Sequence, residues 1–214
     1  MRTGLFADTL AALPGQIDQL KQRAAAEADP AAKSRLERQL RVQQAYADQV
    51  KEVRPTPPNV TLDDRMTLIR GDREIRLLYL GHGHTGGDIV VYLPKERLIA
   101  SGDLLVNGIA NLVDGYVNEW PAALEQLKAV DFVDVIPGHG DPFKGKERAD
   151  WFQAYLRDLW KQATDLHNQQ VPSADAAKRI DMTAHKPHYA SIISPGVSAA
   201  AVSRIYAVIE GRAQ

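Results

Sequence analysis

The chain has 214 residues, a formal net charge of -1 and no cysteine. The near-neutral charge gives no electrostatic reason to expect nucleic acid or an anionic membrane surface as a partner. The lack of thiols excludes disulfides and thiolate metal ligands. No apolar run approaches the length of about 20 residues that spans a bilayer, and the first residues lack the uninterrupted apolar core of a signal peptide. The hydrophobic fraction of 44% is that of an ordinary soluble globular chain.

The N-terminal part of the chain predicts helices. Residues 16–53 have a helical pattern, and the pair Asp29-Pro30 is typical of an N-cap followed by proline at the first helical position. We therefore expect two helices that meet near residue 29. The segment at 54–58, Arg-Pro-Thr-Pro-Pro, cannot continue a helix because proline lacks the amide donor and restricts the residue before it. It is predicted to be a linker.

The rest of the chain predicts a mixture of strands and helices. Two hairpins are expected, one pairing 66–69 with 74–80 and one pairing 88–93 with 97–100. A short helix at 120–129, a strand at 132–136 and an amphipathic helix at 146–168 follow. Ser198 is typical of the N-cap of a last helix. This alternation favours a layered α/β fold with its functional groups at strand ends.

Three glycine-rich turns carry potential metal ligands. His84 lies in Gly-His-Gly-His-Thr, Asp103 in Ser-Gly-Asp and His139 in Pro-Gly-His-Gly, at steps of 19 and 36 residues. Each turn follows an apolar run, and glycine allows the tight turn and the close approach that a metal centre needs. Taken singly, each residue is more typical of a turn or a cap. Together, two imidazoles and a carboxylate are the donors that zinc prefers.

The neighbours of His84 are candidates for supporting roles. His82 forms a His-x-His pair with it, which can chelate one ion, but a position beside the ligand or lining the pocket is the preferred interpretation. Thr85 and Asp88 are expected to hold the turn and orient His84, although Asp88 is equally typical of a cap that opens a strand. His185 and His188 are interpreted as loop residues rather than pocket residues. No catalytic side chain beyond the metal ligands is predicted.

The runs GHGHTGGDIVVYLP, LIASGDLL and VIPGHGDP resemble the second half of the metallo-β-lactamase fold superfamily, in the same order and local context. The resemblance covers about residues 60–165. It implies an αββα sandwich and a zinc hydrolase with two ions, in which metal-activated water attacks an ester, thioester, lactam or phosphoester. His84 matches a ligand of the first ion, His139 a ligand of the second, and Asp103 the bridging carboxylate.

One departure from the family is serious. The first ligand cluster of the family, His-x-His-x-Asp-His, occurs nowhere in this sequence. We therefore expect residues 1–214 to be a single but partial domain, truncated at its N-terminus, with a helical segment at 16–53 and a metal-motif region at 60–165. Such a piece should hold zinc weakly or in part and should be inactive alone. Because the native start would lie upstream, the compartment is left open.

Two functions from different classes remain at this point. The first is the zinc hydrolase, with a small-molecule substrate and neither nucleic acid nor membrane as partner. The alternative is a non-catalytic remnant that acts as a binding or interaction module. In either case, the apolar strands at 77–80 and 89–93 would lack the cover that the family's N-terminal sheet provides. The exposed apolar face would then favour oligomers or other association.

Overall fold

The computed structural model describes the backbone of residues 3–54 and 56–212, and the side chains from Leu10 onward; Pro55 of the expected linker lies outside the described residues. The chain divides into two compact units, Met1–Thr61 and Leu62–Gln214. Among the described residues, no helix combines the length and the apolar character needed to cross a bilayer.

The first unit is a pair of helices, α1 (Thr3–Ala26) and α2 (Pro30–Val50). The predicted boundary between them is confirmed, because the Asp29 carboxylate accepts a 2.8 Å hydrogen bond from the Ala32 amide at the start of α2. Helix α1 begins well before residue 16 and continues through Pro14. Its first turns are rich in alanine and leucine, whose high helix propensity offsets the hydrogen bond that proline removes.

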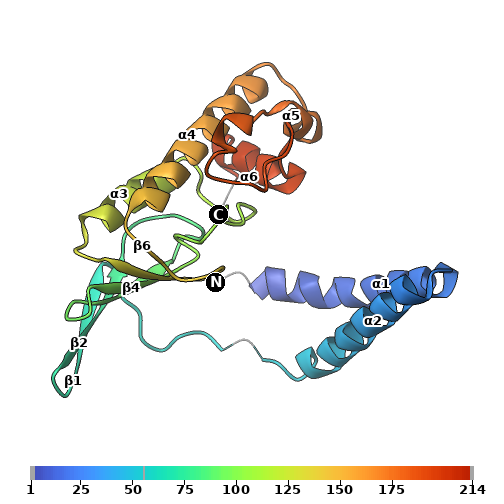
Figure 1. Ribbon diagram of the computed structural model, residues 1–214, viewed down its shortest axis with the longest axis horizontal. Coiled ribbons are helices and arrows are strands. Elements are labelled where there is room, and N and C mark those ends of the chain that lie inside the picture. The colour runs from blue at the N-terminus through green and yellow to red at the C-terminus, as the bar shows by residue number, and fades with distance from the viewer. Residues whose placement is uncertain (1–2, 55, 213–214) are drawn as a thin grey trace. The chain divides into compact units, whose positions relative to one another are not determined.

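The second unit contains a six-stranded sheet in the order β1-β2-β3-β4-β5-β6 (Figure 1). Both predicted hairpins are present. All neighbouring strands are antiparallel except β4 and β5, which are parallel. The strands are β1 (Arg65–Arg70), β2 (Arg73–Tyr79), β3 (Ile89–Leu93), β4 (Leu98–Gly102), β5 (Asp134–Pro137) and β6 (Phe143–Lys144), the last of which the sequence pattern did not predict.

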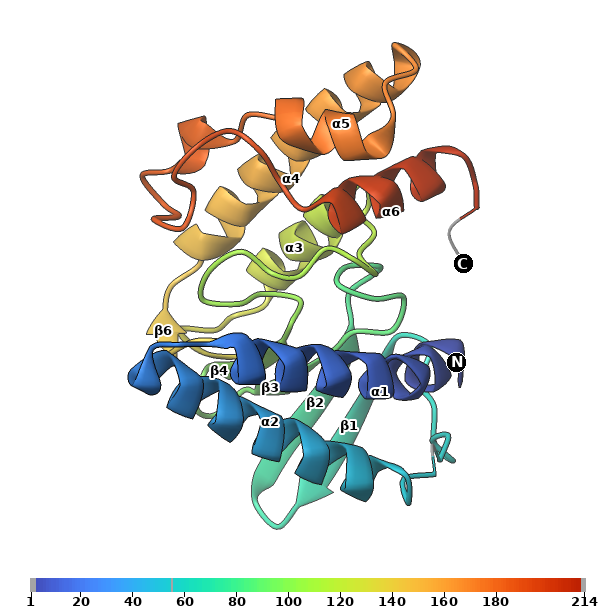
Figure 2. The same ribbon diagram turned by 90° about the vertical axis from the view of Figure 1, so that its right-hand side faces the viewer.

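The helices of this unit lie on one side of the sheet (Figures 1 and 2). The predicted helices are confirmed as α3 (Trp120–Ala129), α4 (Glu147–Asn168) and α6 (Ala199–Ile209), whose N-cap is Ser198. Two short elements were not predicted, α5 (Ser173–Arg179) and the 3-10 helix η1 (Thr183–His185). The mixed α/β class predicted from the sequence is confirmed.

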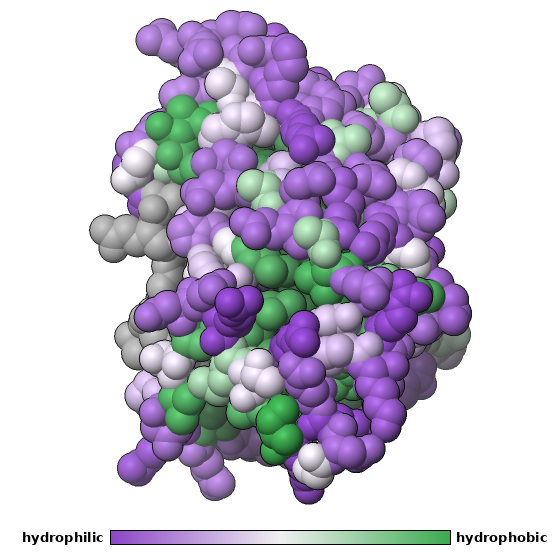
Figure 3. All heavy atoms as spheres, turned by 90° about the vertical axis from the view of Figure 1, so that its left-hand side faces the viewer, coloured by the Kyte–Doolittle hydropathy of each residue, from purple (hydrophilic) through white to green (hydrophobic). Residues whose placement is uncertain are grey.

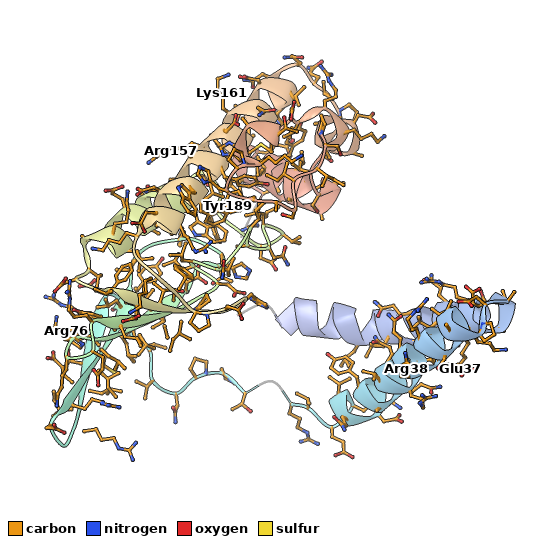
Figure 4. The ribbon with its side chains drawn as sticks, in the orientation of Figure 1. Glu37, Arg38, Arg76, Arg157, Lys161 and Tyr189 are labelled. Carbon is orange, nitrogen blue, oxygen red and sulfur yellow. The ribbon has the colours of Figure 1, made fainter. Side chains whose placement is uncertain are left out.

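The core lies between the sheet and these helices. On the helix-facing side, Val90, Ile99 and Val135 are almost fully buried and pack with Trp120 and Phe152 from α3 and α4. On the other side of α4, Arg157 and Lys161 project away from the core (Figure 4). Helix α4 thus has one apolar face in the core and one polar face in solvent.

The opposite face of the sheet is also apolar. Strand register places Met66, Leu77, Val91, Ala100 and Ile136 in one row across five strands. Paired residues share a face, so this row lies opposite the buried one. Its members are not fully buried; Ile136 is 47% exposed. On the side that carries β1 and β2, hydrophobic residues reach the surface among polar ones (Figure 3).

This open face should drive association in solution. Replacing Leu68 and Ile136, which lie on it, by glutamine should raise the dissociation constant of the self-associated form by about 10-fold or more, because burial of one such side chain is worth roughly 1.5–3 kcal/mol. Sedimentation velocity over a concentration series measures the effect. The matched control replaces Ile69 and Ile193, which are equally aliphatic and more exposed but lie elsewhere. Equal behaviour of the two double variants would show that the open face does not drive association.

Candidate metal centre

Strand direction brings the three ligand-bearing turns to one edge of the sheet. β2 and β4 are each antiparallel to β3 and therefore run the same way, and β5 is parallel to β4. The carboxyl ends of all three strands consequently face the same edge. His84 follows β2, Asp103 follows β4 and His139 follows β5.

The His84 turn rests on Trp120. The Gly83 carbonyl accepts a hydrogen bond from the Tyr116 amide at 2.9 Å, and the His84 ring meets the buried Trp120 ring edge-on at 5.9 Å between centroids. A Cβ at Gly83 would come within 2.4 Å of Leu104. Glycine is therefore needed here so that the turn can lie against the core.

Thr85 and Asp88 close the same turn. The Asp88 carboxylate accepts hydrogen bonds from the Thr85 amide at 2.9 Å and from the Thr85 hydroxyl at 2.7 Å. The Thr85 hydroxyl also accepts a 3.1 Å hydrogen bond from the Gly87 amide. These bonds fix the backbone on the C-terminal side of His84. The hydrogen bonds of both side chains are to each other and to backbone amides, so an effect on the orientation of His84 acts through the backbone.

The Asp103 and His139 turns are joined directly. The Gly138 amide donates a 2.8 Å hydrogen bond to the Gly102 carbonyl, which continues the β4–β5 pairing past the strand ends. Gly102 has a φ of +54°, a conformation that glycine adopts without strain. The Asn107 amide donates to the His139 carbonyl at 3.0 Å. Both turns are therefore held by backbone bonds that are independent of the side chains they present.

The Asp103 carboxylate lies between the two histidines. Its Oδ1 is 2.7 Å from His139 Nδ1 and its Oδ2 is 3.8 Å from His84 Nε2. The side chains of His84 and Asp103 are partly buried, at 20% and 26% exposed, whereas that of His139 is 78% exposed. The structure thus brings together the three residues selected from the sequence. As they are placed, however, the three side chains do not form a group that could hold a metal ion, and the described residues contain no other group of three or more His, Asp or Glu that could.

His82 interacts away from this carboxylate. Its Nδ1 lies 3.0 Å from a Glu119 carboxylate oxygen, and its ring stacks on Tyr116 with 4.5 Å between centroids. Burial raises the pKa of the nearby Tyr79 phenol, and the negative charges of Glu119 and Asp88 add to the effect. Glu119 and Tyr116 were not selected from the sequence. The sequence offers only one indication of their role, which is that both precede the helix that begins at Trp120.

The remaining histidines make contacts elsewhere in the second unit. His185 pairs with Asp158 at 3.0 Å, and His188 stacks on Trp151 at 4.3 Å between ring centroids. His167 also has a carboxylate partner. Its Nε2 lies 3.1 Å from a Glu210 carboxylate oxygen, because α6 packs beside the end of α4 and offers that partner.

Gly138 should be essential to the arrangement. A Cβ there would lie 2.1 Å from Asp103 Oδ1 and 2.7 Å from the Gly102 carbonyl carbon, so Gly138→Ala should displace the carboxylate from His139 and lower the free energy of unfolding by about 1–3 kcal/mol. Denaturant unfolding and the His139 ring signals in NMR spectra measure both effects.

The control is Gly87→Ala, because a Cβ at Gly87 meets nothing within 4 Å. It should change the unfolding free energy by less than about 0.5 kcal/mol. Unperturbed His139 signals in Gly138→Ala would contradict the close packing of the two turns.

Known proteins are similar in sequence to parts of this chain. A 77-residue segment is 38% identical to a metallo-beta-lactamase type 2 of Bacillus cereus, covering 33% of this chain and 30% of the relative. A 110-residue segment is 34% identical to that of Bacteroides fragilis, covering 46% of this chain and 44% of the relative. The chain thus spans less than half the length of these curated relatives.

A solved structure is also similar, the metallo-beta-lactamase from Pontibacter korlensis. Its TM-score is 0.44 at 23% identity, and the match covers 54% of this chain and 55% of that one. The sequence model of the metallo-beta-lactamase superfamily matches residues 17–139, which is more than half of the chain. The chain therefore belongs to the metallo-β-lactamase superfamily, a family of hydrolases.

Proposed function

We propose that this chain supplies part of the ligand set of a zinc-dependent hydrolase. His84 would hold one ion, His139 the second, and Asp103 would bridge them. The observation that carries the proposal is the position of the Asp103 carboxylate, whose two oxygens face different histidines. Asp103 lies close enough to both histidines for the three side chains to serve as ligands of neighbouring ions.

The donors present fit one part of a zinc site. Two imidazole nitrogens and a carboxylate have the right chemistry, and they are presented by turns that the backbone fixes independently. They do not make a complete site, because a catalytic zinc normally has three protein ligands of its own and the His-x-His-x-Asp-His cluster is absent from this sequence. Zinc, when bound, would lower the pKa of a coordinated water to about 7.

The surrounding residues would shape the reaction site. Trp120 provides a dry floor beneath His84, and its indole nitrogen donates a 2.9 Å hydrogen bond to the Leu104 carbonyl next to Asp103. One buried side chain thus supports both turns. The substrate would be a small molecule with an ester, thioester, lactam or phosphoester bond. The names of the relatives make lactams the first class to test. Nothing in the described residues favours the alternative of a non-catalytic binding module.

Zinc titration of the chain tests the ligand assignment. We expect weak binding, and we expect Asp103→Asn and His139→Gln each to weaken it by more than about 10-fold, because each removes a donor. Isothermal calorimetry and metal analysis after dialysis measure the effect. The matched controls are Asp131→Asn, which removes an exposed partner of Arg97, and His167→Gln, whose ring pairs with Glu210.

Two outcomes would contradict the assignment. Equal losses in the ligand and control variants would mean that zinc binds non-specifically. Tight binding of two ions that survives Asp103→Asn would mean that other side chains form the site, and His82, His185 and His188 would then be tested in the same way.

Asp103 should matter more to catalysis than His82. In an active zinc-loaded form, His82→Ala should cost at most about 10–100-fold in kcat/KM, as for residues that act through a ligand. Asp103→Ala should cost more, since it removes a contact to both ions. Steady-state kinetics with metal analysis decides the order. Small and equal losses would show that Asp103 is not a ligand.

A further inference from the structure

A cavity of about 330 Å³ lies in the helical layer of the second unit. Five segments line it: residues 109–112 after β4, the middle of α4, Met182 before η1, the loop 191–198 and the start of α6. None of His84, Asp103 and His139 lines it. Its volume is at the lower end of the range for small-molecule sites and about twice that of a cavity known to admit benzene.

The lining of this cavity is uncharged and partly apolar, with polar groups contributed by Asn111, Ser191, Ser194 and Ser198. Leu159, Met182 and Ala201 line it and are almost fully buried. The described residues that line the cavity include no Asp, Glu, Lys, Arg or His. Moving an ion into such surroundings without a partner is costly, so a ligand carrying net charge is disfavoured.

Tyr155 is the most deeply buried polar side chain of this lining. Tyr155 is 5% exposed, and its hydroxyl has no hydrogen-bond partner among the described residues. That oxygen is nevertheless not sealed from solvent-accessible space, unlike the buried unpartnered oxygens of Glu96 and Thr164. Burial raises the pKa of Tyr155 to about 12, so the phenol is a neutral donor at physiological pH. Because the hydroxyl oxygen is open to solvent, an acceptor on a ligand would take the place of water as its hydrogen-bond partner.

The cavity wall is held in place by specific contacts. The loop 191–198 is tied down by hydrogen bonds from the Gly196 amide to the Ile180 carbonyl at 2.8 Å and from the Val197 amide to the Ala177 carbonyl at 2.9 Å. His185, paired with Asp158, meets the Tyr155 ring edge-on at 5.5 Å between centroids. Ring orientation at Tyr155 is therefore fixed by the surrounding structure, as a binding site requires.

We propose that this cavity is a second binding site, which takes a small, uncharged, largely apolar molecule with one hydrogen-bond acceptor for the Tyr155 hydroxyl. The site is separate from the metal-ligand turns in its lining. It is joined to them through the loop after β4, where the Asn107 side chain donates to the Asp141 carbonyl at 3.0 Å and its amide donates to the His139 carbonyl. The proposal does not depend on zinc or on hydrolysis.

Fluorine NMR of three matched probes tests the site on the whole chain. The probe para-fluoroacetophenone has a ring and a carbonyl acceptor, para-fluorotoluene lacks the acceptor, and para-fluorobenzoate is an anion. We expect saturable binding of the ketone, binding of the toluene weaker by about 5-fold, and no saturable binding of the anion.

Variants locate the bound probe. Tyr155→Phe should lower the affinity for the ketone by about 5-fold and leave the affinity for the toluene unchanged, because it removes only the hydrogen-bond donor. The matched control is Tyr189→Phe, because Tyr189 is also buried and contacts Tyr155 edge-on but does not line the cavity. Ser191→Trp, at the exposed rim, should block both neutral probes without touching the core.

Several results would overturn the proposal. These are no saturable binding of the ketone to wild type at millimolar concentration, equal affinity for ketone and toluene, equal effects of the Tyr155 and Tyr189 variants, and binding that survives Ser191→Trp. The last result would place the probe elsewhere, such as on the open sheet face. Circular dichroism of each variant shows that a loss of binding is not a loss of fold.

Discussion

The parallel pairing of β4 with β5 is the constraint on which the candidate metal centre depends. In an otherwise antiparallel sheet, successive turns alternate between the two edges, and Asp103 and His139 would lie at opposite edges if β5 were antiparallel to β4. The crossover through α3 reverses this, so both turns emerge at the same edge. The same crossover places Trp120 at the start of α3, beneath His84. The crossover connection therefore determines the position of the site.

Local chemistry explains which parts of this arrangement were predictable. The two hairpins, the Asp29 cap and the Ser198 cap depend on residues that are close in sequence, and they were predicted at or near their observed bounds. The glycine turns indicated the candidate ligands because glycine is required where the backbone packs closely. A Cβ at Gly83 or Gly138 would clash with neighbouring atoms. The short elements β6 and η1 were missed, since elements of two or three residues have no periodicity to detect.

Contacts between distant segments account for the rest. Glu119 meets His82 across 37 residues and Glu210 meets His167 across 43, and nothing in either local sequence indicates the partner. The Tyr155 cavity was even less predictable from the sequence, because five separate segments line it and their composition is that of ordinary core and loop. The amphipathic pattern predicted the helix that carries Tyr155, but the cavity beside this side chain depends on where α6 and the loop 191–198 pack.

The two faces of the sheet differ in how they are covered. The helix-facing side has a dry core that fixes Trp120 and, through it, the turns of His84 and Asp103. The opposite side is equally aliphatic along the row from Met66 to Ile136, yet the helices of its own unit leave it open. A sheet that is apolar on both faces is stable only when both are covered, because exposed apolar area costs roughly 25 cal/mol per Å². The strands therefore carry the requirement for a second layer in their own sequence, whichever molecule supplies it.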